Sequence, residues 1–258
     1  MNNLQLITSD QKFGFCLVPI SPVRSEAKDV SEISTQLLFG EPVIIISLEE
    51  SWVRIKTFFD QYKGYVDVKH LLPLSESSLK EWKDNSIFQY EFIKDIQTPW
   101  GKQITSRGSF VGKTTTFKIG NYAFSQSLNL NQTKRFSEIC KELLNTSYLW
   151  GGKSVFGIDC SGFVQMIFRL SEINLPRDAY QQAEIGSEVN FSDCLEGDIA
   201  YFINKQGKII HVGIILENYQ IIHASGRVRI DQLTETGIYN SDYQKQTHQL
   251  CFIKRIKN

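Results

Sequence analysis

The stretch that most constrains the fold runs from Gly157 to Arg169, where a glycine-bearing turn leads into an apolar segment. Apolar residues recur in this segment at helical spacing, at Phe163, Val164, Ile167, Phe168 and Leu170. The pattern predicts a buried helix with Cys160 in its first turn. The free N–H groups and the positive dipole end of a helix start favour a thiolate, which is the nucleophilic form of cysteine. We therefore interpret Cys160 as a candidate nucleophile.

Two histidines downstream lie on short, β-branched apolar segments. His211 opens the segment 211–216 and His223 lies in the segment 220–225, with a turn-like sequence at 217–219 between them. This arrangement predicts a hairpin that brings the two histidines close together across its strands. His211 could then act as general base to Cys160, and His223 could orient the ring of His211.

Other interpretations of these three residues have to be weighed. A buried cysteine is often a small hydrophobe, and a histidine on an apolar strand is often an ordinary core residue. Cysteine and histidine also bind zinc, but no CxxC or HxxxH spacing occurs here. We therefore expect no metal site and no cofactor.

The order of motifs is more specific than any one of them. It comprises Tyr148-Leu149-Trp150-Gly151-Gly152, Asp159-Cys160-Ser161-Gly162-Phe163, Gly197-Asp198, His211-Val212-Gly213-Ile214 and His223-Ala224. Over residues 133–256 the chain resembles the NlpC/P60 family of papain-like cell-wall cysteine peptidases. The resemblance implies an α+β catalytic domain of helices packed on a small antiparallel sheet. The residues of segments 227–230 and 251–255 predict that these add edge strands to the sheet.

The residues before this domain are rich in short predicted strands and turns. Residues 1–75 resemble a bacterial SH3-type β-barrel, through motifs around Pro22, Leu37 and Trp52. Residues 76–130 are predicted to hold a polar linker with a short helix that starts near Ser75 and includes Trp82. A second, divergent SH3-like barrel is expected after it. The predicted architecture is therefore one or two SH3-like barrels at 1–75 and 76–130, followed by a papain-like domain at 131–258.

Composition narrows the range of partners. The 258 residues contain 28 Lys and Arg against 28 Asp and Glu, and 41% are hydrophobic. This balance argues against nucleic acid or an anionic membrane as a partner. The five cysteines have no framework spacing and the first ten residues do not read as a secretory signal, so we expect reduced thiols and a cytoplasmic location. The oligomeric state is left open, with a monomer expected.

The family resemblance also implies roles for further residues. Tyr148 is expected to donate to the oxyanion, beside the backbone N–H of Cys160. Chains with this layout resemble γ-D-glutamyl-L-diamino acid endopeptidases of murein recycling, which cleave stem peptides between D-Glu and meso-diaminopimelate or Lys when the L-Ala amine is free. The implied substrate-binding residues are Asp159, Ser161, Tyr65, Glu26, Trp150 and Asp178, with the barrel carrying Tyr65 closing the cleft.

These residues also have purely structural interpretations, and the sequence is compatible with other functions. Asp159 could simply cap the helix, Tyr65 could be a barrel aromatic, and Glu26 a solvated turn residue. The alternatives to a recycling peptidase are an exported hydrolase of intact peptidoglycan, an acyltransferase on the same scaffold, and a non-catalytic peptide-binding protein. A binding module would need none of Cys160, His211 and His223.

Overall fold

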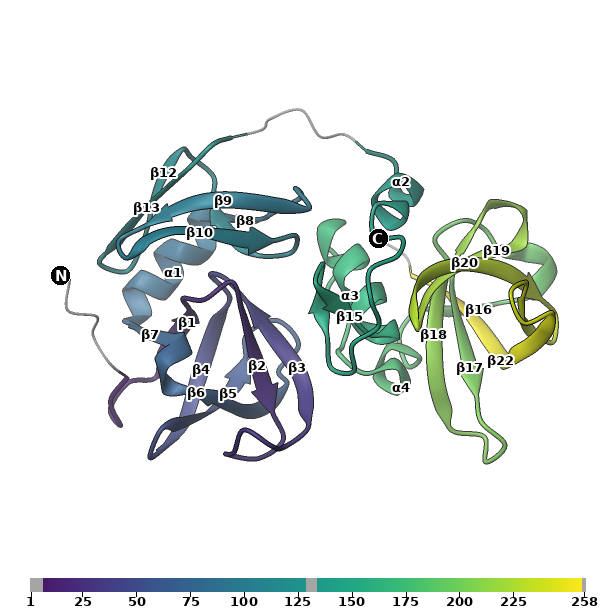
Figure 1. The fold of residues 1–258 in the computed structure, drawn as a ribbon, viewed down its shortest axis with the longest axis horizontal. Helices are drawn as coiled ribbons and strands as arrows, with labels where there is room; N and C mark the ends of the chain where they lie inside the picture. The colour runs from purple at the N-terminus through teal and green to yellow at the C-terminus, as the bar shows by residue number, and fades with distance from the viewer. Residues whose placement is uncertain (1–6, 129–133, 257–258) are drawn as a thin grey trace. The chain divides into compact units, whose positions relative to one another are not determined.

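The computed structural model describes residues 7–128 and 134–256 (Figure 1). The described residues fall into two compact units, which we call unit 1 (within 1–132) and unit 2 (within 133–258). The three-way division of the chain predicted from the sequence stays a prediction. Each unit is described below by itself.

The first part of unit 1 is a seven-stranded antiparallel sheet with the order β3-β2-β6-β5-β4-β1-β7. Its strands alternate buried and exposed residues, as Val53 and Ile55 show in β5, so one face lies on an apolar core. The elements are β1 (Phe13–Cys16), β2 (Ile20–Arg24), β3 (Ile33–Leu38), β4 (Pro42–Glu49), β5 (Trp52–Thr57), β6 (Lys63–Asp67), the 3₁₀ turn η1 (Val68–His70) and β7 (Leu71–Leu74).

The second part of unit 1 contains a four-stranded sheet with the order β10-β9-β13-β12 and a separate two-stranded pair, β11-β8. Helix α1 (Glu76–Asn85) precedes it, capped by the Ser75 hydroxyl, which accepts from the N–H of Ser78. The strands are β8 (Ser86–Phe88), β9 (Ile93–Thr98), β10 (Gly101–Ser106), β11 (Phe110–Gly112), β12 (Thr116–Ile119) and β13 (Tyr122–Gln126).

The sequence had suggested a polar linker around Trp82. The structure shows that helix α1 is instead packed into the core of unit 1 through this side chain. Trp82 is 1% exposed, stacks on Phe117 with ring centroids 5.6 Å apart, and donates from Nε1 to the carbonyl of Gly40 at 2.8 Å. The same apolar core includes Phe15 from the first sheet. Helix α1 is therefore part of a core that both sheets of unit 1 share. The polar sequence of the helix concealed this, because only Leu79 and Trp82 are buried in it.

Unit 2 contains helices packed on a closed antiparallel barrel. Strands β22, β17, β18, β19, β20 and β21 follow one another, and a further β21–β22 pairing closes the ring, with β16 outside on β22. The elements are α2 (Phe136–Lys141), β14 (Lys153–Ser154), β15 (Gly157–Ile158), α3 (Cys160–Leu170), α4 (Ala179–Gln182), β16 (Ser187–Val189), η2 (Phe191–Asp193), β17 (Ile199–Ile203), β18 (Ile209–Leu216), η3 (Glu217–Tyr219), β19 (Gln220–Ser225), β20 (Arg227–Thr234), β21 (Gly237–Asn240) and β22 (Lys245–Arg255).

The closed barrel corrects one detail of the expected catalytic domain. Segments 227–230 and 251–255 were predicted to be edge strands, but β20 pairs on both sides and β22 pairs with three neighbours. In β20 the polar Arg229 and Asp231 are bonded to each other, and Asp231 is buried beside His223. The α+β fold predicted from the sequence is confirmed.

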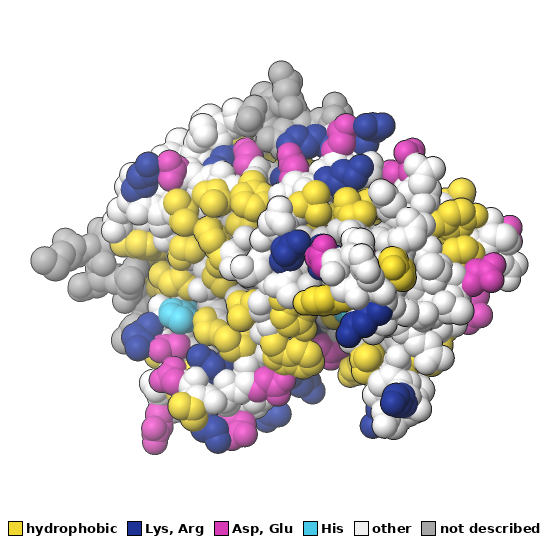
Figure 2. Space-filling view, turned by 45° about the vertical axis from the view of Figure 1, so that its right-hand side comes forward, with side chains coloured by type: hydrophobic (Ala, Val, Ile, Leu, Met, Phe, Trp, Pro, Cys, Tyr) yellow, Lys and Arg dark blue, Asp and Glu magenta, His cyan; other side chains and the backbone are white. Residues whose placement is uncertain are grey.

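The distribution of charged side chains on the surface agrees with the balanced charge of the sequence (Figure 2). On the face shown in Figure 2, side chains of both signs are interspersed and neither sign forms a broad patch. Among residues 7–128 and 134–256, no helix has the length and apolar character needed to cross a bilayer.

Candidate active site

Helix α3 places Cys160 at its first position. The preceding residue, Asp159, has extended backbone and caps the helix, its Oδ1 accepting from the N–H of Gly162 at 2.7 Å. All eleven residues of α3 are buried, and the helix packs on strands β18 and β19 of the barrel. A helix buried on every side holds its first turn rigidly, and Cys160 is only 8% exposed.

A glycine is required two residues after the cysteine. A Cβ at Gly162 would lie 2.3 Å from the carbonyl oxygen of Gly152, which is too close for any side chain. The loop 148–152 therefore lies directly on the first turn of α3, with Gly151 in the left-handed region at φ +75°. This contact explains the glycine after Cys160-Ser161, whereas Gly152 is required because its Cβ would lie 2.4 Å from the carbonyl oxygen of Gly157.

The thiol of Cys160 rests in its neutral form. Burial, followed by the nearby charge of Asp159, raises the pKa of Cys160 to about 12, although backbone N–H groups of Val212 and Ser161 donate toward the sulfur. The sequence had suggested that the helix start would favour a thiolate. Burial outweighs that effect, so a base has to remove the thiol proton during reaction.

The predicted base lies on the strand that touches the thiol. Val212, whose N–H faces the sulfur, follows His211 in β18. Across the hairpin, Nε2 of His211 lies 2.7 Å from Nδ1 of His223 in β19. The predicted proximity of the two histidines is therefore found, and Nδ1 of His211 is the ring nitrogen left to serve the thiol.

Two further side chains complete this cluster, and sequence reasoning missed both. Nε2 of His223 lies 3.1 Å from Oδ2 of Asp231 in β20, and the ring of His248 in β22 stacks on His211 at a centroid distance of 4.2 Å. We call His211, His223 and His248 the barrel histidines. Asp231 shares its face of β20 with Arg227, Arg229 and Leu233, so no apolar alternation marks it, and nothing in the sequence marks His248.

The charge states of the barrel histidines follow from their surroundings. Burial lowers the pKa of His211 well below its ordinary value, with further lowering by His223 and His248. Burial also lowers the pKa of His223, against the opposing effect of Asp231. Burial likewise lowers the pKa of His248, to about 4. All three are therefore neutral near pH 7, as a general base requires.

Tyr148 lies on the loop that covers the helix start. It is half-buried and forms an isolated parallel bridge with Ile158, two residues before Cys160. Burial, and then the charges of Cys160 and Asp159, raise the pKa of Tyr148 to about 12. Its hydroxyl therefore keeps its proton and can donate. The oxyanion role of Tyr148 stays a prediction.

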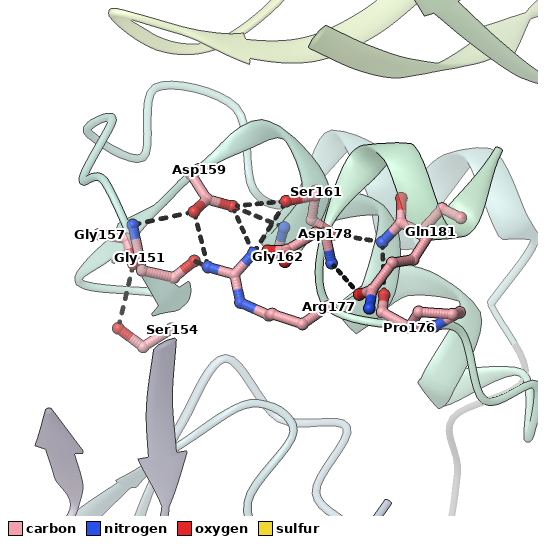
Figure 3. A network of polar contacts seen from close by, with 12 residues as sticks. Gly151, Ser154, Gly157, Asp159, Ser161, Gly162, Pro176, Arg177, Asp178 and Gln181 are labelled. Atoms are coloured by element: carbon pink, nitrogen blue, oxygen red, sulfur yellow. Dashed lines mark hydrogen bonds and ion pairs between the residues drawn. The ribbon is translucent and has the colours of Figure 1, made fainter. Parts of the chain in front are cut away.

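Asp159 and Ser161 belong to a buried polar network centred on Arg177 (Figure 3). Arg177 donates to both carboxylate oxygens of Asp159, at 3.0 and 2.6 Å, and to Oγ of Ser161 at 2.8 Å. Asp159 also accepts from the backbone N–H of Gly151 and Gly162 and from the Ser161 hydroxyl. Its charge is therefore balanced internally, and its capping interpretation is confirmed. The substrate-binding roles of both residues stay predictions.

The remaining predicted residues are distributed over both units. In unit 2, Trp150 is 63% exposed and Asp178 is the half-buried N-cap of α4. In unit 1, Tyr65 of β6 pairs with Arg24 of β2, and the exposed Glu26 forms an ion pair with Lys28 at 2.6 Å. Roles for these four side chains in substrate binding stay predictions.

A metal site would need several ligands close together. In the described part of the chain, no group of three His, Cys, Asp or Glu side chains has an arrangement that could hold an ion. The barrel histidines are hydrogen-bonded or stacked on one another, as described above.

Comparisons with known proteins agree with this geometry. The profile of the NlpC/P60 family matches residues 145–249, and that of the bacterial dipeptidyl-peptidase SH3 domain matches residues 23–71. A γ-D-glutamyl-L-lysine dipeptidyl-peptidase of Bacillus subtilis (strain 168) is 27% identical over 279 aligned positions, covering 98% of this chain and 86% of the relative. One of the same name from Bacillus cereus (strain ATCC 10987) is 36% identical over 227 positions, covering 76% of this chain and 68% of the relative.

Solved structures show the same fold. An NlpC/P60 family protein of Bacillus cereus ATCC 10987 superposes with a TM-score of 0.77 at 17% identity, covering 94% of this chain and 99% of the other. An NlpC/P60 endopeptidase of Photobacterium damselae subsp. piscicida gives 0.71 at 17% identity, covering 95% and 72%. Taken with the sequence matches, these findings show that the chain belongs to the NlpC/P60 family of cysteine peptidases and carries an N-terminal bacterial SH3-type domain.

Proposed function

We propose that this chain hydrolyses the bond between γ-D-Glu and a diamino acid, meso-diaminopimelate or Lys, in murein stem peptides whose N-terminal L-Ala amine is free, and releases L-Ala-D-Glu. The observation that carries the proposal is its similarity, over 98% of its length, to a relative named for γ-D-glutamyl-L-lysine dipeptidyl-peptidase activity. The site supports it, because a buried thiol and a neutral histidine pair suit attack on an amide.

The reaction would proceed in two steps. His211 accepts the thiol proton at Nδ1 while the sulfur of Cys160 attacks the γ-carbonyl of D-Glu, and the oxyanion is stabilised by the N–H of Cys160 and the hydroxyl of Tyr148. The imidazolium returns the proton to the leaving amine of the diamino acid, which leaves a thioester. Water, activated by His211, then releases the dipeptide and restores the thiol.

The requirement for a free amine rests on the predicted substrate-binding set. An ammonium group needs an anion and hydrogen-bond acceptors, and Glu26 and Tyr65 of unit 1 together with Asp159 were predicted to supply them. Asp159 is paired with Arg177 in a buried ion pair, whereas Glu26 is paired with Lys28 at the surface, where solvent screens the pair and a ligand can replace Lys28. Glu26 is therefore the stronger candidate for the charge. Trp150, exposed beside the glycine pair, and Asp178 would contact the rest of the peptide.

A free-amine requirement would also set the place of the enzyme in metabolism. In intact peptidoglycan the L-Ala amine is bonded to the glycan, so such an enzyme acts after another hydrolase has released the peptide. We therefore propose a role in recycling of cell-wall peptides, in the cytoplasm.

The test is a paired digestion analysed by mass spectrometry. One substrate is L-Ala-γ-D-Glu-L-Lys, or its diaminopimelate form, and the other is the same peptide with an acetylated amine. Release of L-Ala-D-Glu from the free-amine peptide alone is the expected result. Cleavage of both peptides would favour a hydrolase of intact wall, and peptide transfer to an added amine in place of hydrolysis would favour an acyltransferase.

The role of unit 1 is tested by Tyr65→Ala, with Tyr62→Ala as a matched control on the neighbouring turn. If Tyr65 contributes to closing the substrate site, the first variant should lose the discrimination between free and acetylated peptides and the second should keep it. Equal discrimination by Tyr65→Ala and wild type would refute this part of the proposal.

A further inference from the structure

Asp231 is a buried carboxylate beside the histidine pair. Its side chain is fully buried, and Oδ2 receives Nε of Arg229 at 2.7 Å, Nε2 of His223 at 3.1 Å and Nδ2 of Asn240 at 3.4 Å. Oδ1 receives the second guanidinium nitrogen of Arg229 at 2.8 Å. Arg229 also pairs with the exposed Asp242. Asp231 is therefore surrounded by donors and is held as an ionised acceptor.

This acceptor determines where the histidine protons lie. A carboxylate cannot donate, so Nε2 of His223 must carry a proton to bond Asp231. In a neutral ring the other nitrogen, Nδ1, is then an acceptor, and it lies 2.7 Å from Nε2 of His211. Nε2 of His211 must therefore carry a proton as well. The remaining nitrogen, Nδ1 of His211, is left unprotonated.

We infer that Asp231 is a positioning residue that fixes both His211 and His223 in the Nε2–H tautomer, so that Nδ1 of His211 is free to accept the proton of Cys160. The inference rests on the proposed peptidase chemistry, since the tautomer matters only if His211 is the base. The opposite tautomer of His211 would present an N–H to the thiol and could not take its proton.

The surroundings of the carboxylate keep it from competing for that proton. The hydrogen bond from His223 and those from Arg229 lower the pKa of Asp231 despite its burial. When the thiol proton moves to Nδ1 of His211, the imidazolium can strengthen its bond to His223, and His223 its bond to Asp231, without any proton reaching the carboxylate. His248 of β22 stacks on His211 and also lies close enough to Asp231 to be affected by its charge.

Two substitutions of Asp231 distinguish the effect of its hydrogen-bond acceptor from the effect of its negative charge. Asp231→Leu keeps the approximate volume but removes the acceptor, so the Nε2 proton of His223 would be buried without a partner. The pair should then invert to Nδ1–H tautomers, and kcat should fall about 10²- to 10⁴-fold with little change in KM. In Asp231→Asn the amide oxygen can take the position where three donors converge, so the loss should be no more than about tenfold.

Asp198→Leu is the matched control. Asp198 is another buried carboxylate of the same barrel, paired in two places with an arginine, Arg255, at 2.8 and 2.7 Å, and bonded to the N–H of Leu195 rather than to a histidine. Its loss should reduce stability to a similar extent as Asp231→Leu while leaving the kcat of the folded enzyme near the wild-type value.

The decisive measurement is nitrogen-15 NMR of the histidine rings in the wild-type protein, which reports the tautomer without any substrate. The expected spectrum shows protonated Nε2 and unprotonated Nδ1 for both His211 and His223, inverted in folded Asp231→Leu. A protonated Nδ1 on wild-type His211, or an Asp231→Leu enzyme as active as Asp198→Leu, would overturn the inference. Because the spectrum needs no peptide, failure of the proposed substrate would appear separately, as absence of cleavage by wild type with the expected tautomers.

Discussion

Removal of Arg177 should be among the most damaging single changes in unit 2. Arg177 is 1% exposed, and its guanidinium donates to both oxygens of Asp159, to Ser161 and to the carbonyl of Gly152. Arg177→Met keeps most of the side-chain length but leaves the buried carboxylate of Asp159 without its cation. We expect the backbone N–H groups that bind Asp159 to compensate only in part.

The magnitude follows from the burial of both partners. Breaking a buried ion pair from one side costs about 3–5 kcal/mol, because the remaining charge is uncompensated. The side chains of Arg177 and Asp159 are 1% and 9% exposed, so solvent screens the remaining charge little. Asp159→Asn added to Arg177→Met removes that charge, and the double variant should be less destabilised than the sum of the two single variants.

The assay is urea denaturation of the four proteins in the double-mutant cycle, with the transition of unit 2 monitored and the m-value checked for constancy. A loss below about 1 kcal/mol for Arg177→Met, or strictly additive effects of the two substitutions, would refute the reasoning. The same variants also report on the site, because Arg177 opposes the rise that Asp159 causes in the pKa of Cys160. Iodoacetamide should therefore alkylate the Arg177→Met thiol more slowly than the wild-type thiol at a given pH.

Three other outcomes are expected. Trp82→Ala should destabilise unit 1 by about 3–5 kcal/mol in a denaturation experiment, since a buried indole and its bond to Gly40 are lost, and a change under 1 kcal/mol would contradict the shared core. Gly162→Ala should shift the first turn of α3 away from Gly152 and lower kcat, and an unchanged kcat would show that the contact is not tight. Burial lowers the pKa of the barrel histidines, to about 4 for His248, so the unfolded chain binds more protons than the folded chain between pH 6.5 and pH 4. The contribution of the neutral histidines to the free energy of unfolding is therefore fully present above pH 6.5. It should fall on acidification, by at most about 1.4 kcal/mol per pH unit for each histidine. A melting temperature that stays level or rises on acidification would contradict this.

The parts of the site that the sequence revealed are those carried by local pattern. Helical spacing after Cys160 predicted α3, and two apolar runs around a short turn predicted the hairpin with both histidines. Such patterns report the periodicity of a single element and its immediate neighbour. The cap formed by Asp159 follows from the same local rule.

The parts that the sequence did not reveal depend on contacts between distant segments. His248 contacts His211 because β22 pairs with β17 and β21 and closes the barrel. No local sequence pattern predicts that closure. Arg177 bonds to Asp159, which lies 18 positions earlier in the chain, before helix α3 and the loop that follows it. Trp82 looked like part of a polar linker because burial of one or two side chains leaves little periodic signal.

The central claim is that the thiol of Cys160 performs the reaction, and one comparison tests it most directly. Cleavage of L-Ala-γ-D-Glu-L-Lys by wild type is compared with cleavage by Cys160→Ala, with Cys251→Ala, which removes an exposed thiol, as the control. We predict that the Cys160 variant folds normally and forms no L-Ala-D-Glu above the uncatalysed rate, while the Cys251 variant remains fully active. Turnover by folded Cys160→Ala within tenfold of wild type would contradict the account.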